Sequence, residues 1–405
     1  MSRPSGEIRW SAHCISSWKI IAKSLDKHIP VLYTLCKRVH KLIQAVALHI
    51  HQRKVMRLHR QEVSIEDIAR AAGVSHSTVS RALRDSTLIS VEVRERIQEL
   101  AREMGYTPNA IAQSLQTRQT STIGLILTSI ADPFWGDVMK GVEEVAREAG
   151  FSVFLGASHN DPEQEMAIIE TFHRRRVDGI LIAASRLTTT NNPRWHSFRV
   201  PIILINSQGE SETPLLHWVS VDDFRGAQLA VEHLLQLGHR TIGYLGTSNR
   251  PRSNRQRFLG YQSVLAANDV PYRDEWVVIS PGNESSNEAS FKEDVVAGRA
   301  CLPRLLDAGV TAIFCYNDMI ATGVLLACRD RGIIVPGELS VIGYDDIEMA
   351  SYVTPPLTTI HQPKIEMGRL ATKVMMDLLH HRPGQNYVLP PILIPRASTA
   401  PFIPV

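Results

Sequence analysis

VSIEDIARAAGVSHSTVSRAL, residues 63–83, predicts two short helices joined by a tight turn. Ser64 precedes an apolar run at helical spacing and has Asp67 three positions on, a pattern typical of a capped helix start. Gly73 suits the left-handed residue that ends a helix, and Val74 can fill the corner between the two helices. These features together predict a helix-turn-helix.

The second helix of this unit carries short polar side chains on its outer face. Ser75 is expected to cap this helix, and its apolar residues are expected to face inward. In such units the start of the second helix enters the DNA major groove, where short hydrogen-bonding side chains and arginine read base edges. The outward-facing residues here are His76, Ser77, Thr78 and Arg81. A small helical bundle with exposed polar residues is the alternative interpretation.

Two further helical segments follow along the chain. Ser90 is expected to cap a third helix, whose apolar residues close the small core: Val93, Ile97, Leu100 and Met104. Pro108 begins a fourth piece, at a position where its missing N–H costs nothing. The fourth piece extends to about Leu115 and is too short to be stable as an isolated helix in water.

The string IARAAGVSHSTVSRAL resembles the helix-turn-helix of the lactose-repressor (LacI/GalR) family of transcription regulators, and GYTPNAIAQSL resembles the segment that follows it. The resemblance extends from about Val63 to Arg396. It implies that bases are read in the major groove by His76 and Ser77 with Arg81, and that Thr78, which the helix pattern places on the same outer face, also positions the DNA backbone. It also implies that the DNA backbone is contacted by Ser64, Ser75, Ser80 and Ser90.

The same resemblance assigns a role to the fourth helical piece. It implies a hinge helix that orders only on DNA and lies in the minor groove beside the hinge of a second subunit. Its contacts would come from Asn109, Ala112, Gln113 and Leu115. Leu115 would be the wedge that opens a base step, and Ala112 is small enough for close approach. An ordinary apolar linker residue is the alternative for Leu115.

After residue 121 the pattern changes to apolar runs of four to six residues that alternate with helical stretches. Such alternation with fully apolar strands predicts parallel sheets covered by helices on both faces. This pattern covers about 280 residues, which is more than a single hydrophobic core usually includes, so two lobes are expected. The strings RRRVDGILI, VEHLLQLGHRTIGYLG, VIGYDD and PPLTTIHQP resemble the periplasmic-binding-protein-like core of the same family. The lobes are expected to meet near Ser220 and at two later crossings, the last near residues 355–365.

A ligand cleft is expected between the lobes, at the carboxyl ends of the strands. The candidate residues, several of them assigned through the resemblance, are Asp132, Phe134, Asp222, Arg257, Phe291, Asn317 and Asp318. Arginine, carboxylate and amide groups beside an aromatic face suit a sugar, which offers vicinal hydroxyls and an apolar ring face. Two alternatives stay open: Phe134 as plain core, and Arg257 and Asp318 as partners of each other or of other residues. Arg250, Arg252 and Arg255 are expected to be solvated loop charges.

Composition agrees with a DNA regulator of two or three domains. The 405 residues carry a net charge of +3, but residues 1–60 hold 12 Lys and Arg against 2 Asp and Glu, a balance of +10. The five cysteines show no CxxC pairing, which argues against a disulfide framework. We expect a basic extension (1–60), a helix-turn-helix domain (61–107), a hinge (108–120) and a two-lobed core for effector binding and dimerisation (121–400).

The basic extension predicts no membrane span or signal peptide, because lysines and arginines interrupt every long apolar run. We expect it to be a disordered arm or an over-called translation start, and the chain to be cytoplasmic. His40, His49 and His51 are too loosely spaced to predict a metal site. No metal and no other cofactor is expected.

These features predict a homodimeric repressor of carbohydrate-utilisation genes, with a higher oligomer left open. It would bind pseudo-palindromic double-stranded operator DNA and a sugar in the cleft, and whether ligand releases or recruits the protein stays open. A nucleoside or purine is the alternative effector. A solute receptor for transport is the alternative class, but it needs a secretory signal and no helix-turn-helix. The chain has no P-loop, GxGxxG, GxSxG or HExxH motif, so no enzyme is expected.

Overall fold

The computed structural model describes residues 63–107, 119–187, 199–207, 216–281 and 291–404. The chain divides into two compact units, Met1–Asn109 and Ala110–Val405. The expected basic extension and all four expected hinge residues (Asn109, Ala112, Gln113 and Leu115) lie outside the described residues. The side chain of Phe291 lies outside them as well.

The first unit contains the predicted helix-turn-helix and a third helix: α3 (Ile65–Ala72), α4 (His76–Ala82) and α5 (Val91–Glu103). Ser64 and Asp67 form the predicted capping box, in which the Asp67 amide donates to Ser64 Oγ and the Ser64 amide donates to Asp67 Oδ2. Gly73 ends α3 in the left-handed region, with φ of 67°. Ser75 Oγ accepts from the Thr78 amide at 3.1 Å and so caps α4.

Two expectations about the third helix are wrong. Ser90 occupies the N-cap position of α5 but makes no capping hydrogen bond with its side chain. Val93 is exposed, because the small core is closed by the buried side chains Ile68, Val79, Ala82 and Ile97. Leu100 and Met104 pack against this core only partly buried. One turn of α5 therefore projects beyond the two helices that it covers.

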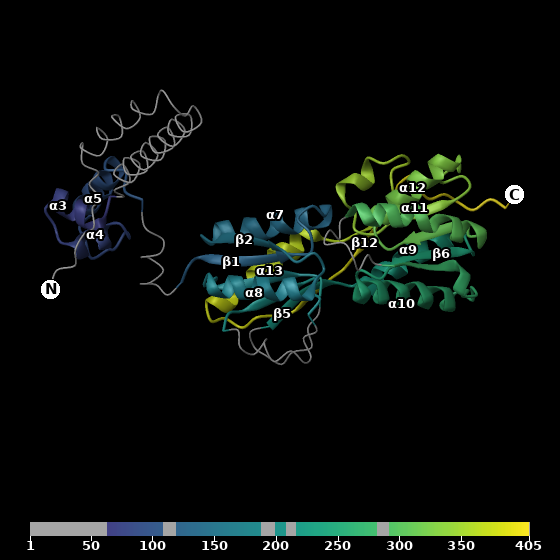
Figure 1. The fold of residues 1–405 in the computed structure, drawn as a ribbon, viewed down its shortest axis with the longest axis horizontal. Coiled ribbons are helices and arrows are strands. Elements are labelled where there is room, and N and C mark those ends of the chain that lie inside the picture. The colour runs from purple at the N-terminus through teal and green to yellow at the C-terminus, as the bar shows by residue number, and fades with distance from the viewer. Residues whose placement is uncertain (1–62, 108–118, 188–198, 208–215, 282–290, 405) are drawn as a thin grey trace, which may run out of the picture. The chain divides into compact units, whose positions relative to one another are not determined.

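The second unit begins with a six-stranded parallel sheet in the order β11-β5-β4-β3-β1-β2. Its strands are β1 (Thr122–Leu127), β2 (Ser152–Ala157), β3 (Gly179–Ala183), β4 (Ile202–Ile205), β5 (Leu216–Val221) and β11 (Tyr387–Leu389). Alternate side chains of the central strands enter two separate cores. One core contains α7 (Pro133–Glu148) and α13 (Lys364–Leu379), and the other contains α8 (Pro162–Arg174). We call this sheet with its helices the first lobe (Figure 1).

The second lobe is a four-stranded parallel sheet in the order β7-β6-β8-β9. Its strands are β6 (Ile242–Thr247), β7 (Val277–Ser280), β8 (Ala312–Cys315) and β9 (Ser340–Ile342). In Figure 1, α11 (Phe291–Asp307) and α12 (Asp318–Arg331) lie on one side of it, and α9 (Asp223–Gln236) and α10 (Pro251–Ala267) lie on the other. Two short 3-10 turns complete this lobe: η2 (Asp274–Trp276) and η3 (Glu348–Ser351). The predicted α/β core of two lobes with parallel sheets is confirmed.

The chain crosses between the lobes three times, and the last crossing differs from the expected one. The first crossing follows β5, as expected near Ser220, and the second follows β10 (Thr359–His361) and leads into α13. β11 then joins the edge of the first-lobe sheet, whereas β12 (Ile392–Ile394) pairs antiparallel with β10. The last crossing therefore lies between β11 and β12. The crossing expected near residues 355–365 is therefore the second one. The sequence analysis did not foresee that the chain continues to β11, which pairs with β5, and then crosses once more.

Close helix packing holds the first lobe together. A Cβ built on Gly141 of α7 would lie 2.0 Å from the Ile365 carbonyl oxygen of α13. A Cβ built on Gly368 of α13 would lie 2.1 Å from the Val138 carbonyl oxygen of α7. Only glycine allows both backbones to approach so closely.

Among the described residues, no helix has both the length and the apolar character that a membrane crossing requires.

Candidate effector cavity and DNA-reading helix

The predicted DNA-reading residues lie at the start of α4. His76, Ser77 and Arg81 are exposed, and Thr78 is half-buried. Ser75 Oγ lies 2.8 Å from Ser77 Oγ, so the cap and its neighbour share one hydrogen-bonded cluster. The exposed arginine thus projects from a helix whose first turn is locally held.

The four serines predicted to contact the DNA backbone do not form a uniform set. Ser64 Oγ donates to Asp67 Oδ2 at 2.7 Å, and the Ser64 amide donates to the same carboxylate oxygen. Both donors of Ser64 are therefore used in the capping box of α3. Ser80 Oγ accepts from Arg84 Nη2 at 2.7 Å. Ser75 is occupied by its cap, and Ser90 is exposed without one. Three of the four thus lie at helix starts, and Ser80 lies within α4 and is half-buried.

A cavity of about 410 Å³ lies between the two lobes of the second unit. Its wall includes loops that follow β1, β3 and β4 of the first lobe and loops that follow β6, β8 and β9 of the second. These are the carboxyl ends of parallel strands, where the sequence predicted the cleft. Four of the seven predicted residues line it: Asp132, Phe134, Arg257 and Asn317.

Arg257 is almost fully buried and is held from several sides. Its Nε donates to Asp223 Oδ1 at 2.8 Å, and its Nη1 lies 3.7 Å from Asp345 Oδ1. The guanidinium carbon lies 3.6 Å from the ring centroid of Tyr344 and 4.4 Å from that of Tyr316. A planar cation between two rings and two carboxylates is fixed in orientation. Arg257 therefore presents a rigid edge to the cavity, and it does not pair with Asp318.

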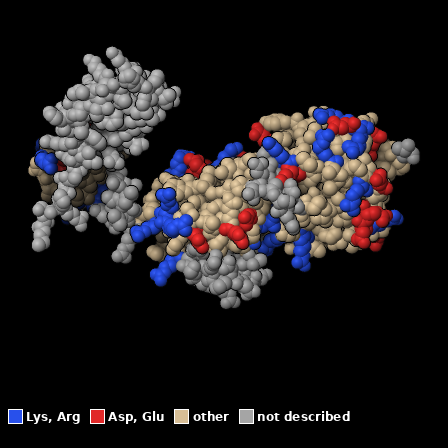
Figure 2. All heavy atoms as spheres, in the orientation of Figure 1, with Lys and Arg blue, Asp and Glu red and all other residues tan. Residues whose placement is uncertain are grey.

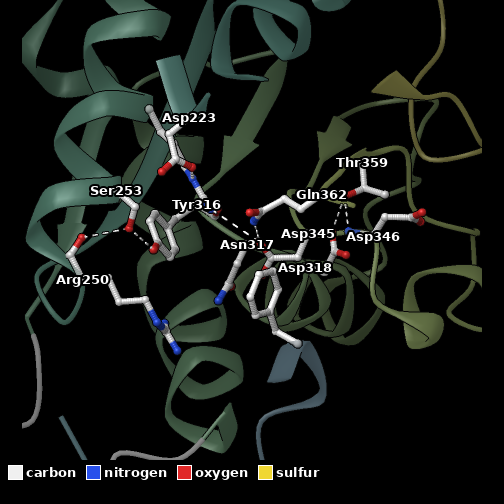
Figure 3. A network of polar contacts seen from close by, with 12 residues as sticks. Asp223, Arg250, Ser253, Tyr316, Asn317, Asp318, Asp345, Asp346, Thr359 and Gln362 are labelled. Atoms are coloured by element: carbon white, nitrogen blue, oxygen red, sulfur yellow. Dashed lines mark hydrogen bonds and ion pairs between the residues drawn. The ribbon is translucent and has the colours of Figure 1, made fainter. Parts of the chain in front are cut away.

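Asn317 and Asp318 are adjacent but have different surroundings (Figure 3). Asn317 caps α12 through its Oδ1, lines the cavity, and donates from Nδ2 to Asp294 Oδ2 at 2.7 Å. Asp318 is fully buried and does not line the cavity. Its Oδ2 accepts from the Ile347 amide at 2.9 Å and its Oδ1 from Thr359 Oγ1 at 2.5 Å.

The expectation that Asp318 faces the cleft is thus corrected, because its carboxyl group is used to join the loop after β9 to β10. The carboxylate that faces the cavity from this side is Asp345, which the sequence analysis did not select. Asp345 accepts from Gln362 Nε2 at 2.6 Å. Burial raises the pKa of Asp345 to about 7, although Arg257 opposes the shift. Its signal in the sequence was its place just beyond the buried strand β9, within VIGYDD.

Arg250 bridges the two lobes, which also corrects its interpretation as a solvated loop charge. Its Nη2 lies 3.3 Å from Asp132 Oδ2 of the first lobe, and its Nη1 lies 3.0 Å from Asp294 Oδ2 of the second. Burial raises the pKa of Asp132, and the Arg250 cation opposes that shift. Arg252 and Arg255 are exposed. Arg250 was missed because only the folded lobes bring Asp132 and Asp294 to opposite sides of it.

Two of the remaining predicted residues have mainly structural surroundings. Phe134 lines the cavity but also belongs to the core of the first lobe, where its ring meets Trp135 edge-on at 4.7 Å. Asp222 caps α9 by accepting from the Arg225 amide at 2.9 Å. It does not line the main cavity but lines a smaller neighbouring one of about 280 Å³. Within the described residues, no cluster of three His, Cys, Asp or Glu is placed to hold a metal ion.

Two acceptors at the main cavity have no hydrogen-bond partner among the described residues. They are Asn206 Oδ1, after β4, and Gln362 Oε1, at the crossing into α13. Both atoms are buried, and an unpaired buried acceptor costs roughly 1–3 kcal/mol.

Comparison with known proteins identifies the family. Residues 64–109 match the model of bacterial regulatory proteins of the lacI family, and residues 231–399 match that of a periplasmic binding protein-like domain. The transcriptional repressor PurR of Haemophilus influenzae is 32% identical over 324 residues, which cover 79% of this chain and 92% of PurR. The chain belongs to the LacI family of bacterial regulatory proteins. It is a ligand-responsive transcriptional repressor.

Two solved LacI-family structures support this assignment. A LacI family transcriptional regulator from Enterococcus faecium with bound ribose is 31% identical, with a TM-score of 0.60 over 70% of this chain and all of that one. The lac repressor dimer bound to operator and the anti-inducer ONPF is 28% identical, with a TM-score of 0.72 over 84% of this chain and all of that one. Such relatives are transcription regulators rather than enzymes or solute receptors.

Proposed function

We propose that this LacI-family protein represses carbohydrate-utilisation genes in the cytoplasm, binding a pseudo-palindromic operator as a homodimer and a sugar in the interlobe cavity. The observation that carries the sugar assignment is the pair of unpaired buried acceptors, Asn206 Oδ1 and Gln362 Oε1, at the cavity wall. Sugar hydroxyls donate hydrogen bonds, and Phe134 supplies an apolar face for the ring. The ribose bound to the relative from Enterococcus faecium supports the same ligand class.

The proposed division of the chain follows from this function. A helix-turn-helix domain of residues 61–107 reads DNA, a hinge of residues 108–120 lies in the minor groove, and a core of residues 121–400 binds effector and dimerises. Within the first domain, α4 enters the major groove with His76, Ser77, Thr78 and Arg81, while Ser64, Ser75, Ser80 and Ser90 face phosphates. In the hinge, Asn109, Ala112, Gln113 and Leu115 contact the minor groove. The dimeric, operator-bound state of the lac repressor supports this arrangement.

A ligand-dependent DNA-binding assay tests the proposal. Duplex DNA is selected from a random pool with the full chain, and the selected site is used for anisotropy titrations with and without pentoses, hexoses, nucleosides and purines. We expect a two-fold-symmetric site and a sugar that changes its affinity. A response to nucleosides or purines alone would replace the sugar assignment. Failure to select duplex DNA would refute the DNA-binding role.

Replacing Arg81 separates base reading from general electrostatics. Arg81→Ala should weaken binding to the selected site by roughly 5- to 150-fold, the worth of one specific side-chain–base contact. Arg96, an exposed arginine of α5 with no described side-chain partner, provides the matched control, because Arg96→Ala removes the same charge. Equal losses for the two variants on the selected site and on random DNA would contradict base reading by Arg81.

A further inference from the structure

The first-lobe arginine Arg186 differs from Arg250 and Arg257, two of the three other arginines that line the cavity. Arg250 contacts two carboxylates, Asp132 and Asp294, and Arg257 contacts Asp223 with Asp345 close by. Arg186 also lines the cavity, but within the described residues its guanidinium makes no ion pair. The one hydrogen-bond partner described for that side chain is the carbonyl oxygen of Asn249 in the second lobe. A neutral carbonyl leaves its charge uncompensated.

The loop that presents Arg186 is built for a fixed position. It follows β3, and Ala184 in it adopts a positive φ of 47°. Glu165 of α8, only 1% exposed, accepts from the Arg186 amide at 2.9 Å and from the Ser185 hydroxyl. The buried carboxylate thus holds the loop through one backbone amide and one side-chain hydroxyl, while the guanidinium lines the cavity and reaches the second lobe.

The electrostatic surroundings of Arg186 favour a negative group beside it. Burial lowers its pKa, and repulsion from Arg250 lowers it further, while Tyr316 and Glu165 oppose these effects only in part. Two cations from opposite lobes therefore approach each other at this end of the cavity. An anion between them would convert repulsion into attraction and favour the closed arrangement of the lobes.

The face of the molecule drawn in Figure 2 does not offer an equivalent field. Figure 2 shows lysines and arginines interspersed with aspartates and glutamates over both lobes on the face drawn. An anionic ligand would therefore be selected by the cavity rather than by a broad basic surface on this face. One unpaired arginine matches one negative charge. A phosphate dianion would bring a second negative charge close to the carboxyl group of Asp132, whose partner Arg250 is already shared with Asp294.

We propose that the effector is a sugar acid, an aldonic or uronic acid, whose carboxylate is bound by Arg186 while its hydroxyls meet the acceptors Asn206 and Gln362. The planar guanidinium can donate two parallel hydrogen bonds to a carboxylate, which a neutral sugar cannot accept in the same way. This inference rests on the proposed function, since it specifies the sugar that occupies the interlobe cavity.

Calorimetry on the full-length chain at constant ionic strength tests this inference with matched ligands. The pairs are glucose with glucuronate and galactose with galacturonate, together with gluconate and glucose 6-phosphate. We expect at least one acid to bind roughly 10-fold or more tightly than its neutral partner, as expected for a charge-assisted pair. Neutral sugars that bind as tightly as the acids would overturn the inference and leave the proposed function standing, as would a preference for the phosphate. No binding of any sugar would overturn both.

Variants at Arg186 show whether this residue is responsible. Arg186→Gln should weaken binding of the acid by about 10- to 100-fold and change the affinity of a neutral sugar by less than about 3-fold. Arg186→Lys should give an intermediate loss, because lysine keeps the positive charge but cannot donate two parallel hydrogen bonds to a carboxylate. Arg175→Gln is the control, since Arg175 is exposed at the end of α8 and lies outside the cavity. Equal losses for acid and neutral sugar would mean that Arg186 acts only through Asn249 and would refute the proposal.

Discussion

At the scale of single residues, the cavity depends on how buried charges are compensated. Arg257 and Arg250 are each placed between carboxylates, whereas Asp345 keeps only a distant contact with Arg257 at 3.7 Å. Its nearest described partner is the neutral amide of Gln362. Burial therefore favours the protonated form of Asp345 and raises its pKa to about 7, although Arg257 opposes the shift.

This compensation predicts a pH-dependent stability. Burial raises the pKa of Asp345 to about 7, with Arg257 opposing, whereas an unfolded aspartate has a pKa of about 3.9. Between these two pKa values the native chain keeps a proton on Asp345 that the unfolded chain releases. The stabilisation that this proton gives to the native state is therefore complete below about pH 4 and is lost as the pH rises to about 7. Asp345→Asn removes this titration. The free energy of unfolding of the wild type minus that of the variant should fall by up to about 4 kcal/mol across this range.

Urea denaturation at several values of pH measures this difference. Asp307, exposed at the end of α11, provides the control, and the difference between the wild type and Asp307→Asn should show no comparable fall with rising pH. A wild-type minus Asp345→Asn difference that stays constant, or that grows with pH, would contradict the raised pKa.

At the scale of the element, two of the three serines at N-cap positions in the first unit make an internal comparison. Ser75 caps α4 with its side chain, whereas Ser90 at the start of α5 does not. Loss of an N-cap costs about 1 kcal/mol. Ser75→Ala should therefore accelerate amide hydrogen exchange in α4 of the full chain by roughly 5-fold, whereas Ser90→Ala should leave α5 nearly unchanged.

Mass spectrometry of exchanged peptides resolves the two helices. Faster exchange in α5 of Ser90→Ala, to the same extent as in α4 of Ser75→Ala, would show that both serines cap. The comparison also separates stability from DNA contact, because either serine can contact phosphate only in the complex.

The crossing of α7 and α13 gives a second prediction at this scale. Gly141→Ala would place a methyl group against the Ile365 carbonyl oxygen, so the helices must separate. Overpacking of this kind typically costs about 1–3 kcal/mol. Gly136 lies in the same helix with nothing within 4 Å of its added Cβ. Gly136→Ala should therefore be neutral or stabilise by up to about 1 kcal/mol.

Equilibrium unfolding in urea measures both substitutions. Equal effects on the free energy of unfolding would show that helix propensity, rather than the close approach of α7 and α13, determines the outcome. Opposite signs are expected, because the two glycines share a helix and differ in what surrounds them.

At the scale of the whole molecule, effector and operator must influence each other equally. If the effector changes operator affinity by a given factor, the operator changes effector affinity by the same factor, typically about 5- to 150-fold. We expect calorimetric titrations of effector into the free protein and into the operator complex to reproduce the factor found by anisotropy. Unequal factors would show that a third state, such as a change of oligomer, takes part.

Much of this protein follows from its sequence alone, because periodicity, capping residues and turn residues act within a few positions of the chain. Such local signals predicted α3 and α4 with the Ser64 cap, the left-handed Gly73, and the buried strands of a two-lobed parallel α/β core. They also placed Asp132 and Asn317 just after buried strands, at the carboxyl ends of the two parallel sheets, whereas Arg257 was assigned through the family resemblance.

The tertiary structure decided which charged side chains face the cavity and which are buried beneath it in hydrogen bonds. Asp318 and Asp345 both follow buried strands in one sheet, but the hydrogen bonds of Ile347 and Thr359 direct the Asp318 carboxyl group inward and leave Asp345 at the cavity. Arg250 became a bridge only when the first lobe brought Asp132 opposite Asp294. These contacts join residues that lie 29 to 118 positions apart in the chain, so no local pattern in the sequence records them.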